Sequence, residues 1–121
     1  MGRQRYQSES TLHEDPPMKC INILYPAKDN DAFDFKFYID RHVPLIKDIL
    51  GASLHRIEVR RGASSQDGAG PPTYTCVISI WIADWPAYEK AIAARASELI
   101  AEVPLFTKVM PQMQIDEVIY P

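Results

Sequence analysis

The chain has 121 residues, of which 46% are hydrophobic, and its formal net charge is −3. This length and composition suit one domain with one hydrophobic core. The weak negative charge argues against a nucleic-acid or anionic-membrane partner, because both require a concentrated basic face. No run approaches the ~18 apolar residues of a membrane span, and the first residues lack the apolar core of a secretion signal, so we expect a cytoplasmic protein.

Residues 1–17 contain few large apolar groups and end in two prolines. This composition predicts a disordered N-terminal tail, followed by a single domain over residues 18–121. From Met18 to Tyr25 the chain is short and apolar, and Pro26 follows. We expect a buried first strand there.

A helix is predicted from Asp34 to Gly51, with Asp34 as its N-cap and Gly51 as its stop. Pro44 has no amide proton to donate and its ring crowds the preceding turn, so a kink or pause is expected near it. Apolar residues recur at spacings of three and four, which predicts one buried stripe. The stripe consists of Phe35, Ile39, Val43, Ile46, Ile49 and Leu50.

Two further strands are predicted on either side of a flexible connection. Ser53 to Arg61 alternates and carries charges on one side, which is typical of an edge strand. Thr73 to Ala83 is the most apolar and β-branched run, which predicts a central strand. One face of that strand mixes polar and apolar side chains, which favours a cavity lining, although a half-exposed sheet face would have the same composition. This face carries Thr73, Thr75, Val77, Ser79 and Trp81.

A second helix is predicted to begin at Asp84, its N-cap, with Pro86 in the first turn. Its expected buried stripe is Trp85, Tyr88, Ile92, Ala96, Leu99 and Val103. An irregular passage then leads to a last strand over Gln112 to Tyr120. The order strand, helix, strand, strand, helix, strand predicts an α+β, ferredoxin-like fold, with a four-stranded antiparallel sheet and both helices on one face. Cys20 and Cys76 fall in predicted strands and are too few for a disulfide framework, so we expect free thiols.

His42 and Tyr38 are the candidate catalytic residues. His42 lies in the stripe of the first helix, three residues after Ile39 and four before Ile46, so its imidazole is expected to face the interior. Tyr38 is four residues earlier and shares that side. Histidine titrates near neutral pH, so His42 could accept a proton from a substrate while Tyr38 orients the ring or donates to an oxyanion. A core histidine satisfied by one hydrogen bond would show the same pattern.

Three segments resemble the EthD family, named for a protein of ethyl tert-butyl ether degradation. They are FYIDRHVPLI over residues 37–46, VPLFT over residues 103–107, and a P-x-x-Q-x-x-E-V run over residues 111–118. Tyr38, His42, Pro44 and Leu45 match a Tyr-x-x-x-His-x-Pro-Leu motif, and the likeness extends over residues 18–120. The resemblance implies a dimeric α+β barrel, in which two ferredoxin-like subunits join their sheets, as in cofactor-free monooxygenases and muconolactone isomerases.

The resemblance also implies a function. The chain is expected to be a cofactor-independent oxidoreductase of small-molecule catabolism or secondary metabolism, acting by acid-base chemistry on a small apolar or aromatic ligand. An isomerase is the runner-up. A non-catalytic carrier for a separate monooxygenase and a purely structural dimer remain open. The expected substrate-binding residues are Phe35, Pro44, Tyr74, Trp81 and Phe106. The expected partner is a second copy of the chain, and no metal or organic cofactor is expected.

Overall fold

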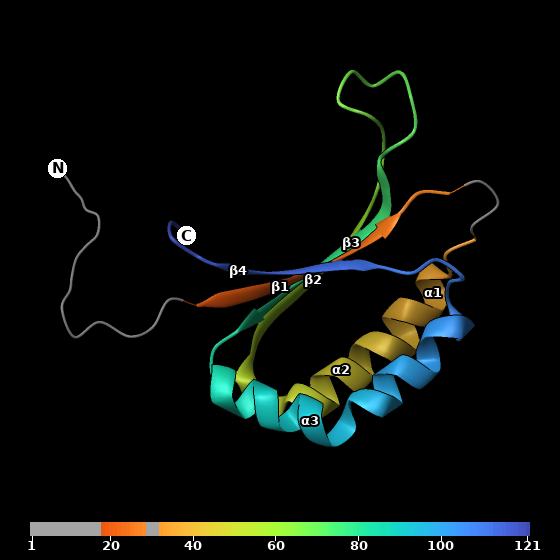
Figure 1. The fold of residues 1–121 in the computed structure, drawn as a ribbon. Coiled ribbons are helices and arrows are strands. Elements are labelled where there is room, and N and C mark those ends of the chain that lie inside the picture. Colours follow the sequence, from red (N-terminus) through yellow and green to blue (C-terminus); the bar gives the residue numbers. More distant parts are fainter. Residues whose placement is uncertain (1–17, 29–31) are drawn as a thin grey trace, which may run out of the picture.

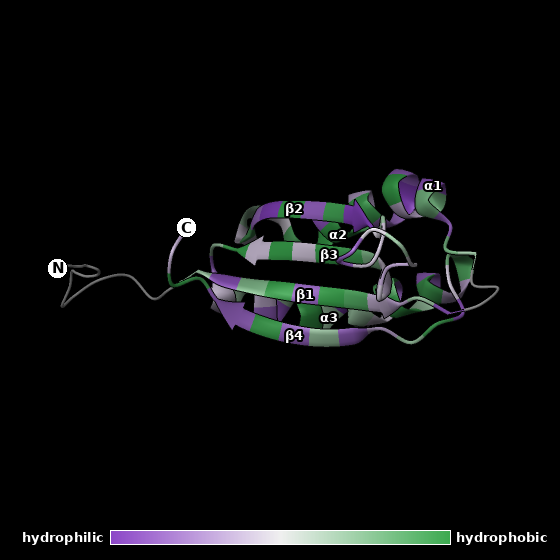
Figure 2. Cartoon of the chain, turned by 90° about the horizontal axis from the view of Figure 1, so that it is seen from above, coloured by the Kyte–Doolittle hydropathy of each residue, from purple (hydrophilic) through white to green (hydrophobic). Residues whose placement is uncertain are grey.

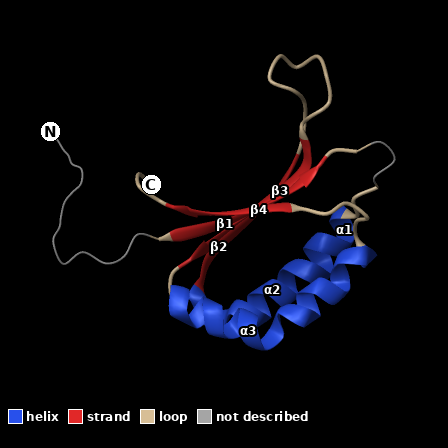
Figure 3. Cartoon of the chain, in the orientation of Figure 1, coloured by secondary structure: helices blue, strands red, loops and turns tan. Residues whose placement is uncertain are grey.

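The computed structural model describes residues 18–28 and 32–121 of the chain. The predicted tail over residues 1–17 lies outside this part. The elements are, in order, β1 (Lys19–Pro26), α1 (Phe35–Phe37), the π-helical turn η1 (Tyr38–His42), α2 (Val43–Leu50), the 3₁₀ turn η2 (Gly51–Ser53), β2 (Leu54–Arg61), β3 (Tyr74–Ile82), α3 (Trp85–Glu102), the 3₁₀ turn η3 (Val103–Leu105) and β4 (Gln112–Glu117). The helices all lie on one face of the sheet (Figures 1 and 3).

The four strands form one sheet in the order β2-β3-β1-β4, and every neighbouring pair is antiparallel. This is the ferredoxin-like arrangement, so the predicted fold class is confirmed. The charged strand β2 lies at an edge, and the β-branched strand β3 lies inside the sheet, as expected. Seen from above, α3 lies beneath β1 and β4 (Figure 2). The last strand ends at Glu117, three residues before the predicted Tyr120.

The two faces of the sheet differ in polarity, and the strands alternate accordingly in Figure 2. Ile21, Ile78 and Ile80 belong to the buried core on the helix side. On the other face Ser79 donates to the Asn22 side-chain oxygen at 2.8 Å. The Trp81 face was expected to line a cavity or to be a half-exposed sheet face, and none of its residues lines the cavity between the sheet and the helices. It is the sheet face opposite the helices and mixes polar and apolar side chains, because β-strand side chains alternate and the helices cover only the isoleucine face.

The first helix is interrupted where the proline predicted a kink. The Val43 amide donates to the Tyr38 carbonyl five residues earlier, which closes a π-helical turn just before Pro44. Because this turn holds more residues than an α-helical turn, it rotates the following residues relative to the preceding ones. Tyr38 and His42 are buried, whereas Ile39 is 48% exposed. The predicted buried stripe is therefore wrong at Ile39.

The predicted helix caps are confirmed. The Asp34 side chain accepts a hydrogen bond from the Phe37 amide at 2.9 Å, and Asp84 accepts one from Ala87 at 3.1 Å. Gly51 ends α2 with a φ of +52°, which favours glycine. The two cysteines are buried free thiols, also as predicted.

Candidate functional site

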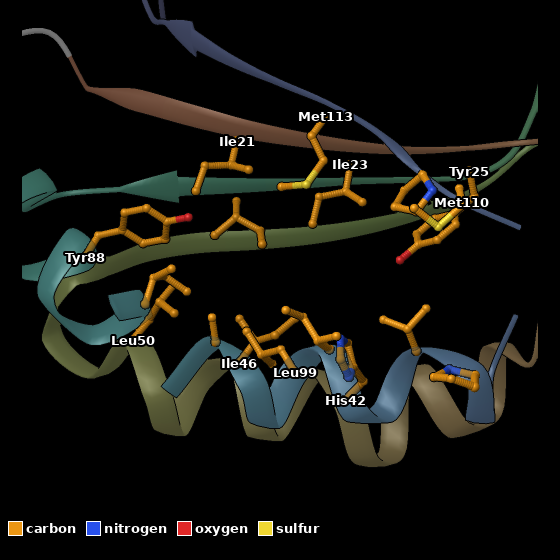
Figure 4. A pocket seen from close by; sticks show the side chains of 17 residues that line it. Ile21, Ile23, Tyr25, His42, Ile46, Leu50, Tyr88, Leu99, Met110 and Met113 are labelled. Atoms are coloured by element: carbon orange, nitrogen blue, oxygen red, sulfur yellow. The ribbon is translucent and has the colours of Figure 1, made fainter. Parts of the chain in front are cut away.

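An apolar cavity of about 600 Å³ lies between the sheet and the helices (Figure 4). Its walls come from β1, η1, α2, β3, α3, η3, β4 and the passage between η3 and β4. The side chains that line it are Ile21, Ile23, Tyr25, His42, Ile46, Leu50, Ile80, Tyr88, Ile92, Ala96, Leu99, Ile100, Val103, Pro104, Met110, Pro111 and Met113. A few polar groups in a mostly apolar concave wall are typical of a small-molecule site.

The mouth of the cavity lies between the carboxyl end of α3 and strand β4. Three of the lining residues are widely exposed, namely Ile100 at 68%, Met110 at 82% and Met113 at 62%. Met side chains are flexible, so they can adjust to ligands of different shapes. A molecule can therefore reach the cavity without unfolding of the domain.

His42 carries the site's strongest potential for acid-base chemistry. The π-helical turn places its ring at the cavity wall, where the residue is only 5% exposed. Its Nδ1 lies 2.9 Å from Glu102 Oε1, at the end of α3. A carboxylate can only accept, so Nδ1 carries the proton and donates it, which leaves the Nε2 lone pair free in the neutral ring.

Two aromatic rings, those of Tyr38 and Phe106, pack against the His42 imidazole. The Phe106 ring centroid lies 4.9 Å from those of both His42 and Tyr38, and the Tyr38 and His42 centroids are also 4.9 Å apart. The Phe106 carbonyl accepts a hydrogen bond from the Asp34 amide at 2.8 Å. The passage after α3 is thereby tied to the start of the helix that carries His42.

Tyr25 is a further polar group in the cavity wall. It is 3% exposed, and its ring packs edge-on against Phe33 and Phe106. Burial, with a smaller contribution from Cys76, raises the pKa of Tyr25 to about 12. The hydroxyl therefore stays protonated at neutral pH and can act as a hydrogen-bond donor.

The structure brings only some of the predicted site residues together. His42 lines the cavity, and Tyr38 and Phe106 are buried against its ring without lining the cavity themselves. Burial raises the pKa of Tyr38, chiefly because its phenolate would be desolvated.

The other four expected substrate-binding residues, Phe35, Pro44, Tyr74 and Trp81, are not part of the cavity wall. Pro44 is exposed, and the Tyr74 hydroxyl donates to the Gln112 side chain at 3.1 Å. Trp81 lies on the opposite face of the sheet, where the Arg56 guanidinium is 4.8 Å from its ring centroid.

Sequence reasoning missed Glu102, Tyr25 and Tyr88 as site residues. Glu102 lies three residues after Leu99, at the border of the predicted stripe of α3, so its helical position was a usable signal. Tyr25 shares a strand face with Ile21 and Ile23, which also line the cavity. Tyr88 was predicted as a buried packing residue and instead lines the cavity.

Neither a metal centre nor a membrane segment is found in the described part of the chain. Within residues 18–28 and 32–121, no group of three or more His, Cys, Asp or Glu side chains could hold a metal ion. No helix among the same residues is both long and apolar enough to cross a membrane.

Two of the solved structures that match this chain are similar to it in fold. An EthD-like protein from Ralstonia eutropha JMP134 matches with a TM-score of 0.82 and 24% sequence identity, over 88% of this chain and 96% of that chain. The chain has the EthD-like fold. An EthD family protein from Bacillus halodurans C-125 matches with a TM-score of 0.59 and 20% identity, over 84% of this chain and 98% of that one. No family model and no curated protein matches the sequence. These likenesses establish the EthD-like fold that the sequence resemblance implied.

Proposed function

We propose that this EthD-like chain is an enzyme that removes a proton from a small, mostly apolar or aromatic molecule without help from a metal or organic cofactor. The observation that carries the proposal is the His42–Glu102 pair at the wall of an apolar cavity. His42 is the proton acceptor, and the substrate occupies the space between the sheet and the helices.

The pair is suited to general base catalysis. Glu102 holds the ring in the tautomer whose Nε2 is unprotonated, and its negative charge stabilises the imidazolium that forms when Nε2 takes a proton. The interaction is strengthened by burial, since His42 has a side chain 7% exposed and Glu102 one of 20%. The surrounding apolar side chains keep water away from the carbanion or oxyanion that remains on the substrate.

The reaction class we favour is cofactor-independent oxygenation, in which the deprotonated substrate passes an electron to dioxygen. An isomerisation starts with the same proton transfer and is the second candidate. A carrier that binds the ligand without turnover would use the same cavity. We also propose, from the EthD-like fold, that the chain works as a cytoplasmic homodimer.

The test measures how fast enolisable bicyclic ketones exchange their protons for deuterium in D₂O. NMR monitors the exchange, and oxygen consumption is measured in the same samples. We expect the wild-type protein to accelerate exchange and His42→Gln to lower the rate by roughly 10²-fold or more, with an unchanged melting temperature. Oxygen uptake would favour the oxygenase, and double-bond migration without oxygen uptake would favour the isomerase.

Glu102→Gln is the companion variant, because it keeps the shape of the side chain and removes its charge. We expect a smaller loss of rate than in His42→Gln, since the imidazolium that forms during proton transfer loses its counter-charge. A stable His42→Gln protein with the wild-type rate would refute the catalytic proposal. Ligand binding without exchange in the wild type would leave the carrier as the function.

A further inference from the structure

The Tyr25 side chain is buried and lies in the cavity wall. Among the described residues nothing forms a hydrogen bond with its oxygen, although the residue is only 3% exposed. Figure 4 shows the hydroxyl directed into the cavity. A buried donor that lacks an acceptor costs free energy, and native proteins rarely leave one unpaired. The position is therefore suited to an acceptor atom supplied by a ligand.

Tyr25 and His42 lie in the same half of the cavity. Both rings pack on Phe106, with centroid distances of 6.0 Å for Tyr25 and 4.9 Å for His42. Tyr88, whose hydroxyl is also in the cavity wall, lies at the opposite end (Figure 4). A ligand placed against the free nitrogen of His42 would thus present neighbouring atoms to Tyr25 and its more distant atoms to Tyr88.

The charges around the cavity restrict the ligand. The described residues that line it include no Lys, Arg, Asp or Glu. A ligand carboxylate or ammonium would therefore lose its water without gaining a fixed counter-ion in the wall. The Tyr25 hydroxyl can donate a hydrogen bond to an acceptor atom of the ligand, and an oxygen on a neutral molecule meets both conditions.

We propose that Tyr25 is a second catalytic residue and that the substrate class is the neutral, mostly apolar enolisable ketone. In the step, the C–H bond next to the carbonyl breaks and its proton passes to His42 Nε2. The electron pair of that bond moves through the new C=C bond onto the carbonyl oxygen. Tyr25 donates its hydrogen bond to this oxygen, whose negative charge grows as the enolate forms. This inference rests on the proposed function of His42.

The experiment compares 2-tetralone with tetralin, which has the same bicyclic frame and no oxygen. We expect the wild-type protein to bind 2-tetralone ~10-fold more tightly than tetralin, as one hydrogen bond in an apolar site provides. Tyr25→Phe should remove this preference and leave the tetralin affinity unchanged. The infrared carbonyl stretch of bound 2-tetralone should lie at lower frequency in the wild type than in Tyr25→Phe.

Tyr88→Phe is the matched comparison, because it deletes a hydroxyl from the other end of the same cavity. The preference for 2-tetralone should survive in Tyr88→Phe. Three outcomes would overturn the proposal: the preference persists in Tyr25→Phe, it disappears in Tyr88→Phe instead, or the wild type binds neither probe. The melting temperature of Tyr25→Phe is expected to equal or exceed that of the wild type, because an unpaired hydroxyl is removed.

The experiments distinguish a failure of the proposed His42 base from a failure of the proposed Tyr25 donor. If His42→Gln exchanged the protons of 2-tetralone at the wild-type rate while Tyr25→Phe lost the carbonyl shift, Tyr25 would be the ligand-binding donor and His42 would not be the base. If His42→Gln abolished exchange while Tyr25→Phe retained both binding preference and rate, the base would stand and the role of Tyr25 would be refuted.

Discussion

Burial determines the protonation of several side chains around the cavity. Desolvation raises the pKa of Tyr25 to about 12 from an ordinary value of 10.0, and that of Cys76 to about 12 from 9.0. Tyr38 is shifted in the same direction for the same reason. In each case the apolar surroundings penalise the negative charge, so the neutral form is favoured in the folded protein.

These shifts predict alkaline destabilisation. The unfolded chain releases the Cys76 and Tyr25 protons near their ordinary pKa values of 9.0 and 10.0, whereas the folded chain retains them until about 12. Their contribution to stability is complete below pH 9 and is lost as the pH rises through the folded pKa values. Urea unfolding at several pH values between 8 and 12 should show this decline.

Tyr25→Phe is expected to remove the part of the decline that arises above about pH 10. The matched control is Tyr120→Phe, because Tyr120 is 90% exposed and its environment changes little on unfolding. A free energy of unfolding that stays constant from pH 8 to 11.5 in the wild type would contradict the assignment.

The interrupted first helix is the element that places the site. An uninterrupted α-helix would place Tyr38 and His42 one turn apart and would also bury Ile39 on nearly the same side. The π-helical turn changes this register, so that Tyr38 and His42 are buried while Ile39 is 48% exposed. π-helical turns often occur at functional sites because they redirect one side chain without breaking the helix.

Gly51, at the end of α2, has a strained backbone. Gly51 has φ +52° and ψ −131°, a backbone conformation that residues with a Cβ rarely adopt. We expect Gly51→Ala to lower the free energy of unfolding by about 1 to 3 kcal/mol. The cost is conformational alone, since an added Cβ would meet no atom within 4 Å. Chemical denaturation measures it.

Gly70→Ala is the control for this change. Gly70 does not have a positive φ, and its added Cβ would meet Ser65 at 3.4 Å, which is ordinary contact. The control should change the free energy of unfolding by less than about 0.5 kcal/mol. If Gly51→Ala were as stable as Gly70→Ala, the backbone strain at Gly51 would not limit stability.

The molecule as a whole leaves apolar surface exposed along one edge of the sheet. Among the described residues β4 pairs with β1 alone, and Ile115 on it is 54% exposed. Ile119 and Tyr120, just beyond it, are 86% and 90% exposed. Adjacent exposed apolar residues next to an unpaired strand edge are typical of an association surface.

We predict that the chain forms a homodimer in which this edge is covered. Sedimentation at micromolar concentration should show a dimer, and Ile115→Lys should weaken association by roughly 10-fold or more, because a charge would be buried at the contact. Ile39→Lys is the control, since Ile39 is a comparably exposed isoleucine on the first helix. A monomeric wild-type protein, or equal effects of the two lysine variants, would contradict the prediction.

The order of the elements could be predicted from the amino-acid sequence, because the signals for helices and strands are local. Helix caps at Asp34 and Asp84, the periodicity of the helices and the β-branched run of β3 act over a few residues, and each predicted element is present. The interior position of His42 was also predictable, since helical spacing alone points it toward the apolar side.

The groups that meet in the cavity could not be predicted in the same way, because they come from distant segments. Glu102 is 60 residues from His42, and their contact depends on how α3 packs beside η1 and α2. The Tyr25 hydroxyl, which has no hydrogen-bond partner among the described residues, lies in the cavity wall, whereas Trp81 does not. Both positions have the same origin, because the face that the helices cover decides which side of each strand lines the cavity. Such pairings arise from packing between distant segments, and local periodicity carries no information about them.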